Sequence, residues 1–256
     1  MEGGVHASIG ELTTDRLRAA LASGRPAAVL LPVGSVEPHG PHLPLMTDTI
    51  ISEAAAARAA ERLEKEGVSA FVAPAVPYGV TEFAAGFAGA ISVPAEVLTS
   101  FLRAVVRGYL DAGFAHVCLV NNHLEPAHDG AVRAAIEGFA GGSASVACPL
   151  TRRWGRTLSA EFKSGACHAG EYETSLVLAA APETVDWAGA ATLPDVAVSL
   201  SDGIKAGKKS FAEMGMEQAY TGAPARATAE QGEEMLDRLA TMIATEVTEG
   251  LARKAG

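Results

Sequence analysis

The segment GSVEPHGPHLPLMTDT, residues 34–49, places metal-binding side-chain types directly after an apolar run. Glu37 and His39 are two residues apart, so in an extended segment both side chains point to the same side. Asp48 follows at the start of a predicted helix and can fold back towards them. Such nitrogen and oxygen ligands suit a divalent ion such as zinc, manganese or iron. The alternative is that Asp48 only helps to start its helix, while Glu37 and His39 are solvated loop residues.

A second pair of the same kind occurs in the segment VNNHLEPAH, where His123 and Glu125 follow another apolar run. Each pair alone is weak evidence, because a single histidine at a strand end is more often structural. Together with Asp48, the two pairs offer five potential ligands, enough for two ions that share a bridging carboxylate. Two-metal sites of this kind hold their ions about 3.5–4 Å apart and activate a water molecule for hydrolysis.

The segment GACHAGEYETS contains a third group of candidates. His168 precedes a predicted helix that carries Glu171 and Glu173. Residues two apart on a helix point about 200° apart, so only one of these carboxylates can face a site. His168 can serve as a general acid or base beside the metals. A structural histidine at a helix start is an equal alternative.

The elements that must position these residues alternate between strands and helices over the first 150 residues. Short, continuous apolar runs predict strands that are buried on both faces. This alternation predicts a single α/β domain over residues 1–256, a three-layer α/β/α sandwich around a mostly parallel sheet. In such sheets the reactive groups belong at the carboxyl ends of the strands. The predicted strands are 27–33, 68–76, 116–122 and 143–150, and the predicted helices are 13–22, 47–66, 94–113, 126–139, 170–181 and 228–252.

Composition excludes several function classes. Hydrophobic residues make up 48% of the chain and charged residues 20%, as in ordinary globular proteins. The net charge is −10, and the densest basic cluster, at 205–209, is too short for a nucleic-acid binder. The apolar runs are too short to span a bilayer, and no signal peptide is apparent. We therefore expect a cytoplasmic protein that binds neither nucleic acid nor membrane, with three reduced thiols at Cys118, Cys148 and Cys167.

Taken together, these motifs resemble those of the creatininase family, the creatinine amidohydrolases. The segment GSVEPHGPHLPLMTDT is similar to the family pattern LPxGSxEQHGPHLPLxTD. The resemblance continues, in the order of the family, through YGVTEFAAGFAGAISV, VNNHLEP, HAGEYETSLVL and TGAPARATAEQG. It implies a three-layer α/β/α fold, two divalent metal ions per chain, and usually a homohexamer.

The resemblance also implies a ligand set. Glu37, Asp48 and His123 would hold one ion, and His39, Asp48 and Glu125 the other, so that Asp48 bridges the two. The family members cleave C–N bonds of small cyclic or linear amides. This chain is accordingly predicted to be a hydrolase acting on C–N bonds other than peptide bonds, with a water molecule activated by the two ions.

By the same resemblance, His168 and Glu173 are the catalytic residues, with His168 carrying a proton to the leaving nitrogen. Some positions depart from the family. Phe83 stands where a histidine is common, and Cys167 where an acidic residue is common. Creatinine-hydrolysing members use tryptophans around the substrate, and here only Trp154 lies in a suitable loop. A peptide or formamide substrate is therefore an alternative to a creatinine-like amide, and a non-catalytic metal-binding homologue is a second alternative.

Overall fold

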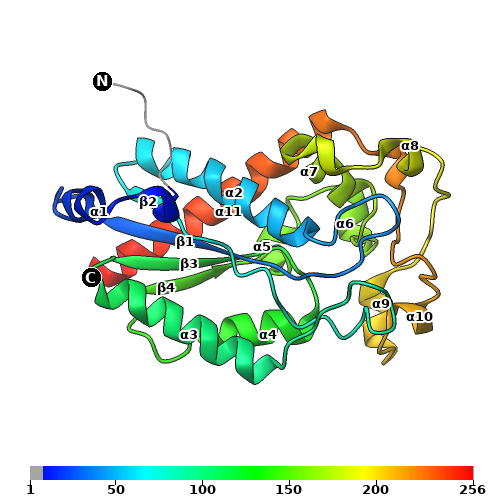
Figure 1. Cartoon of the computed structure of the whole chain (residues 1–256), viewed down its shortest axis with the longest axis horizontal. Coiled ribbons are helices and arrows are strands. Elements are labelled where there is room, and N and C mark those ends of the chain that lie inside the picture. Colours follow the sequence, from blue (N-terminus) through cyan, green and yellow to red (C-terminus); the bar gives the residue numbers. More distant parts are fainter. Residues whose placement is uncertain (1–7, 256) are drawn as a thin grey trace.

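A computed structural model describes residues 8–255, and a sheet of four parallel strands forms its centre (Figure 1). The strand order is β2-β1-β3-β4. All three pairings between neighbouring strands are parallel, so the carboxyl ends of all four strands meet at one edge of the sheet. The strands are β1 (Ala27–Val33), β2 (Ser69–Val72), β3 (His116–Asn121) and β4 (Ala144–Ala147).

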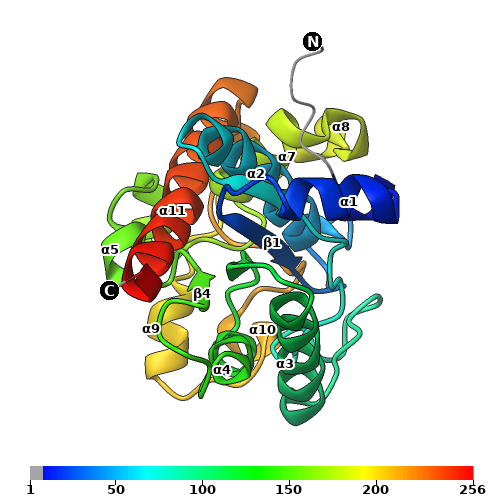
Figure 2. The ribbon, with the colours of Figure 1, turned by 90° about the vertical axis from the view of Figure 1, so that its left-hand side faces the viewer.

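Helices cover both faces of this sheet (Figure 2). In β1, Ala28 and Leu30 pack into the core on one face, while Val29 and Leu31 pack into the core on the other. The prediction of a three-layer α/β/α fold is confirmed, and all four described strands are parallel. The first face carries α2 (Thr47–Lys65), α7 (Glu171–Ala180) and α11 (Ala229–Ala255), and the second carries α3 (Ala95–Asp111) and α4 (Pro126–Ala135).

Shorter elements complete the chain. Most of them lie beyond the carboxyl ends of the strands, on the right-hand side of Figure 1. There, α10 packs with neighbouring loops around a small separate core that contains Phe211, Met214 and Met216. The short helices are α1 (Thr14–Leu21), α5 (Arg152–Gly155), α6 (Ala160–Ser164), α8 (Trp187–Ala190), α9 (Leu200–Lys205) and α10 (Phe211–Met214), with 3₁₀ turns at Ile9–Glu11, Pro182–Thr184 and Pro224–Arg226.

Two of the predicted strands are longer than the observed ones. β2 ends at Val72 rather than at residue 76, and β4 ends at Ala147 rather than at residue 150. Pro74 and Pro149 follow these ends closely, and a proline has no N–H to contribute to the hydrogen-bond ladder. Within the described residues 8–255, no helix combines the length and the apolar character needed to cross a membrane.

Candidate metal centre

The seven predicted site residues lie at the carboxyl edge of the sheet, and all of them are buried. None of the seven is more than 7% exposed. Each comes from a segment that directly follows a strand or begins a helix. The loop after β1 carries Glu37 and His39, the first turn of α2 carries Asp48, and the segment after β3 carries His123 and Glu125. His168 lies just before α7, and Glu173 lies in its first turn.

Gly34 allows the loop after β1 to pass close to the first turn of α2. A Cβ atom at this position would lie 2.4 Å from Oγ1 and 2.8 Å from the backbone nitrogen of Thr49. Any side chain would therefore push the two segments apart. This close approach is what brings Asp48 beside the residues that follow β1.

The structure brings six of the seven residues into three triads: Glu37, His39 and His168 form one, and the other two share the Asp48 carboxylate. Nδ1 of His123 lies 3.1 Å from Oε1 of Glu37 and 3.1 Å from Oδ2 of Asp48. Nε2 of His39 lies 3.2 Å from Oδ1 of Asp48 and 3.5 Å from Oε2 of Glu173. In each triad the candidate ligand atoms lie within 4.8 Å of one another. The two oxygens of Asp48 thus face different triads, as expected of a bridging ligand.

Backbone carbonyls orient the imidazole rings of the two triads that share Asp48. Nδ1 of His39 lies 3.1 Å from the carbonyl oxygen of Glu37, and Nε2 of His123 lies 2.7 Å from that of Val80. A carbonyl only accepts, so each of these ring nitrogens carries the proton and donates it. Nε2 of His39 and Nδ1 of His123 are left to face the carboxylates, an arrangement common for metal-binding histidines.

The donor set fits divalent metal ions. Nε2 of His39 and Oδ2 of Asp48 are buried, and neither makes a hydrogen bond. Leaving buried polar atoms without partners is costly, and an ion between them would satisfy both. Imidazole nitrogens and carboxylate oxygens are ligands of zinc, manganese and iron.

The charges of the cluster shift its titration strongly. Burial disfavours the charged form of His39, but Asp48, Glu173 and Glu37 outweigh it and raise the pKa of His39 to about 10. Burial, reinforced by Asp48, raises the pKa of Glu173 to about 8, although His39 opposes the change. A metal ion must therefore displace protons from this cluster, so its binding depends on pH.

Glu125 lies outside all three triads. Its two carboxylate oxygens accept hydrogen bonds from the backbone N–H groups of Glu82, at 2.9 Å, and Phe83, at 3.2 Å. Burial raises its pKa to about 6. The ligand set predicted for the second ion includes Glu125, whereas the structure places Glu173 beside His39 and Asp48.

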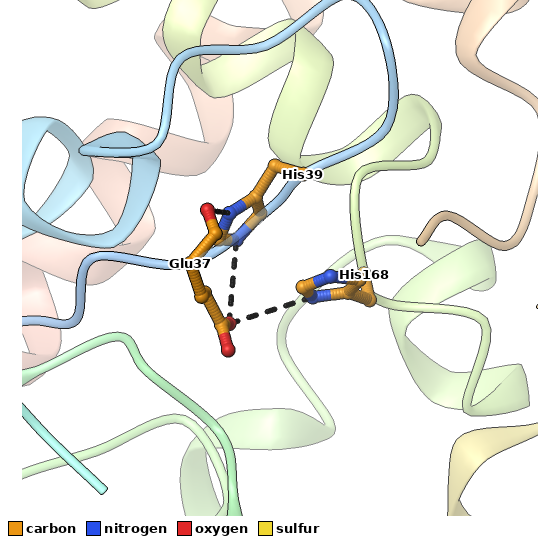
Figure 3. Close-up of side chains that lie close together, drawn as sticks. All are labelled: Glu37, His39 and His168. Atoms are coloured by element: carbon orange, nitrogen blue, oxygen red, sulfur yellow. Dashed lines mark hydrogen bonds and ion pairs between the residues drawn. The ribbon is translucent and has the colours of Figure 1, made fainter. Parts of the chain in front are cut away.

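The His168 ring packs against that of His39, with ring centroids 4.3 Å apart, and the Glu37 carboxylate faces both histidines (Figure 3). Nε2 of His168 donates to the carbonyl oxygen of Pro38 at 3.0 Å, and its Nδ1 lies 3.9 Å from Oε1 of Glu37. Burial and the neighbouring His39 lower the pKa of His168 to about 4. A neutral imidazole with one free nitrogen is suited to accept and return a proton.

Two further residues support the cluster and were not predicted from the sequence. The hydroxyl of Thr81 donates to the Glu37 carboxylate. The ring of His128 packs edge-on against that of His123, with centroids 4.6 Å apart. Thr81 lies inside the family-like segment YGVTEF, which is the only sequence signal that pointed to it.

A cavity of about 340 Å³ opens onto the cluster and is lined by Glu37, Asp48, His123, His168 and Glu173 among others. Its aromatic lining consists of Phe83, Phe162 and Phe211. Trp154 is instead buried in the core, where its indole N–H donates to Glu246 at 2.8 Å. Trp187 is 42% exposed on α8. In the described chain, neither tryptophan lines this cavity.

Comparisons with known proteins identify the family and the fold. The family model Creatininase, described as creatinine amidohydrolase, matches residues 10–247. A mycofactocin precursor peptide peptidase of Mycobacterium tuberculosis (strain CDC 1551 / Oshkosh) is 34% identical over 221 residues, covering 80% of this chain and 78% of the relative. A creatinine amidohydrolase of Pseudomonas putida is 28% identical over 196 residues, covering 70% and 73% of the two chains.

A solved structure described as "Creatininase Mn" superposes with a TM-score of 0.73 and 25% sequence identity, covering 96% of this chain and 99% of that one. The fold, the order of the motifs and the family match over nearly the whole chain all agree. The chain belongs to the creatininase family of hydrolases.

Proposed function

We propose that this hydrolase cleaves the C–N bond of a linear amide or short peptide at a dinuclear metal centre. The observation that carries the proposal is the pair of buried triads that share Asp48. Glu37, Asp48 and His123 would hold one ion, and His39, Asp48 and Glu173 the other. A carboxylate shared in this way would hold two ions close together, as in two-metal hydrolytic sites.

Bound at this centre, divalent ions would polarise the amide carbonyl and lower the pKa of a water molecule. Side chains of the protein would transfer the proton and orient the ligands. Nδ1 of His168 borders the cavity, accepts a proton from the attacking water and returns it to the leaving nitrogen. The Pro38 carbonyl holds the ring in that orientation. Thr81 fixes the Glu37 carboxylate by donating a hydrogen bond to it.

Two observations favour a linear amide or peptide over creatinine. The relative at 34% identity carries the name of a peptide peptidase, and the creatinine amidohydrolase is 28% identical. The cavity also lacks the tryptophans that the family resemblance associates with creatinine, within the residues described. A small cyclic amide is the second candidate, favoured by the His123–Glu125 pair that creatinine-hydrolysing members carry.

The test combines metal removal with one variant. The metal-loaded enzyme is assayed on creatinine, lactams, N-formyl amines and short peptides, before and after chelation and after metal is restored. His168→Asn should keep its metal and its melting temperature and lose about 100-fold or more in kcat, as expected when a general acid–base group is removed. Glu37→Gln and His123→Ala should lose both metal and turnover. Full activity in the metal-free enzyme would contradict the proposal.

A further inference from the structure

Three cationic side chains, Arg152, Arg156 and Lys163, line the mouth of the cavity. We call them the cationic mouth. They come from α5, the turn after it and α6, and all three are exposed. Within residues 8–255, none of them has an ion-pair partner. Arg153, their neighbour on α5, is different, because it contacts both carboxylate oxygens of Glu249, at 2.8 and 3.0 Å.

The cavity itself offers these cations no counter-charge. Its acidic lining residues are buried at the inner end. Three of them, Glu37, Asp48 and Glu173, belong to the metal triads, and Glu125 accepts two backbone hydrogen bonds. In a chain with a net charge of −10, three unpaired cations at one opening form a local attraction for an anion.

The rest of the lining is largely apolar. The buried end therefore carries the candidate metal centre, the exposed opening carries positive charge, and the remaining walls exclude water. A bound molecule would place an apolar body against these walls. The larger apolar side chains of the lining are Phe83, Leu124, Leu150, Phe162, Leu200, Ile204 and Phe211.

We propose that the cationic mouth binds a carboxylate of the substrate, which is then an amide with an apolar body and a free carboxylate. This inference rests on the proposed function, since it assumes that the scissile amide lies at the metal centre. A guanidinium group binds a carboxylate through two parallel hydrogen bonds, which makes arginine well suited to this task. Two sources share this chemistry: a small N-acyl amino acid and the carboxyl terminus of a peptide.

The first test measures binding, independently of turnover. Isothermal titration calorimetry on the metal-loaded enzyme compares N-acetyl-leucine with its neutral carboxamide, N-acetyl-leucinamide. We expect the carboxylate to bind more tightly to the native enzyme. In the double variant Arg152→Gln/Arg156→Gln, its affinity should fall about tenfold or more, while that of the carboxamide stays unchanged. Arg153→Gln is the matched control, since Arg153 lies on the same helix but outside the cavity lining, and it should leave both affinities unchanged.

A carboxylate that bound at the metal ions instead would bind all three proteins equally, and this result would overturn the proposal. An equal loss in the Arg153→Gln variant would also overturn it, because the effect would then be one of general surface charge. All substituted positions are exposed, so each variant is expected to fold, which its melting temperature checks.

The second test separates this inference from the proposed function. Hydrolysis is compared for peptides with a free or an amidated carboxyl terminus and for N-acyl amino acids. A lower KM for free carboxylates, lost in the double variant, supports the cationic mouth, and the better class of substrate identifies the source. Equal turnover of both forms overturns the cationic mouth but leaves the hydrolase proposal standing. Absence of hydrolysis with intact carboxylate binding would overturn the hydrolase proposal and leave the cationic mouth standing.

Discussion

Asp48 is the residue on which the candidate site depends. Its Oδ1 lies 3.2 Å from Nε2 of His39, and its Oδ2 lies 3.1 Å from Nδ1 of His123. Burial would raise its pKa, but these two histidines outweigh burial and hold the pKa well below its usual range. Asp48 is therefore ionised, and its carboxylate is shared by the triads Glu37–Asp48–His123 and His39–Asp48–Glu173.

The ligand set can be decided by metal content. Glu173→Gln should lower the content from about two ions per chain to about one, because it removes a charged ligand beside His39. Glu125→Gln should keep both ions, since the Glu125 carboxylate accepts the backbone N–H groups of Glu82 and Phe83. Elemental analysis of the purified proteins measures both results.

The control for this experiment is Glu171→Gln. Glu171 lies on the same helix as Glu173, but its carboxylate accepts a hydrogen bond from Gln231 on α11, away from the triads. This variant should keep its full metal content. Loss of one ion in Glu125→Gln and none in Glu173→Gln would restore Glu125 to the second site and contradict the ligand set proposed from the geometry.

At the scale of elements, α11 holds α7 in place, and α7 carries Glu173. The sequence pattern of Thr228 and Gln231 predicts a capping box at the start of α11, and half of it is observed: Oγ1 of Thr228 accepts from the backbone N–H of Gln231 at 3.1 Å. The Gln231 side chain bonds instead to Ser175 and Glu171 on α7, both at 2.7 Å. Gln231, whose side chain would complete the capping box, therefore connects α11 to α7 instead.

At Gly232 these two helices approach each other closely. A Cβ atom there would lie 1.8 Å from the backbone oxygen of Ser175, whereas a Cβ on Gly108, in α3, would meet nothing within 4 Å. Gly232→Ala should therefore destabilise the protein by about 1–3 kcal/mol, as overpacking does. Gly108→Ala should stabilise it by up to about 1 kcal/mol, because alanine favours helix. Denaturant unfolding measures both, and the same sign for both variants would contradict this packing argument.

His116 in β3 makes stability depend on pH at a point away from the metal centre. The residue is fully buried, with Nδ1 donating to the Gly142 carbonyl at 2.8 Å and Nε2 2.8 Å from the Ser145 hydroxyl. Burial, reinforced by Arg253 and Lys254, lowers its pKa to about 4, although the hydrogen bond to Gly142 opposes the change. The folded state therefore binds a proton less readily than the unfolded chain.

The sign of the effect follows from linkage. Between pH 6.5 and 4 the unfolded state binds more protons at His116 than the folded state does. The contribution of His116 to the free energy of unfolding is therefore complete above pH 6.5 and is lost as the pH falls towards 4. The loss amounts to about 3 kcal/mol. His116→Gln should flatten the unfolding free energy over this range, relative to the native protein. Parallel curves for the two proteins would rule out His116 as a source of acid sensitivity.

At the scale of the whole molecule, metal binding should govern thermal stability. Without metal, three carboxylates of the two triads are buried together, and ions that bind only the folded state shift the equilibrium towards it. At a metal concentration about 100-fold above Kd, one site adds about 2.7 kcal/mol. This corresponds to a rise of about 5–11 °C in Tm for a chain of this size.

Differential scanning calorimetry with and without zinc or manganese measures this rise. Asp48→Asn is the informative variant, because it removes the carboxylate that both triads share and should abolish most of the shift. A Tm that does not change with metal in the native protein would contradict a metal centre built from these residues. Analytical ultracentrifugation of the same samples tests the hexamer, which stays a prediction from the family resemblance.

The sequence by itself determined the layers of the fold and predicted the residues of the candidate site. The apolar runs at β1 and β3 fit strands buried on both faces, and their boundaries differ from the observed ones by at most one residue. This accuracy has a physical cause, since burial on both faces forces a continuous apolar pattern. The spacing of Glu37, His39 and Asp48 likewise predicted a cluster at a strand end, because parallel strands present their carboxyl ends at one edge.

Only the tertiary structure decided which carboxylate faces which histidine. The sequence predicts Glu125 as a metal ligand and Glu173 as a catalytic residue, but it does not determine where either carboxylate points. Their directions depend on the backbone N–H groups of Glu82 and Phe83 and on the packing of α7 against α11. The cationic mouth also depends on tertiary structure, because α5 and α6 meet the cavity only through folding. Such contacts join residues far apart in the chain, and local patterns carry no information about them.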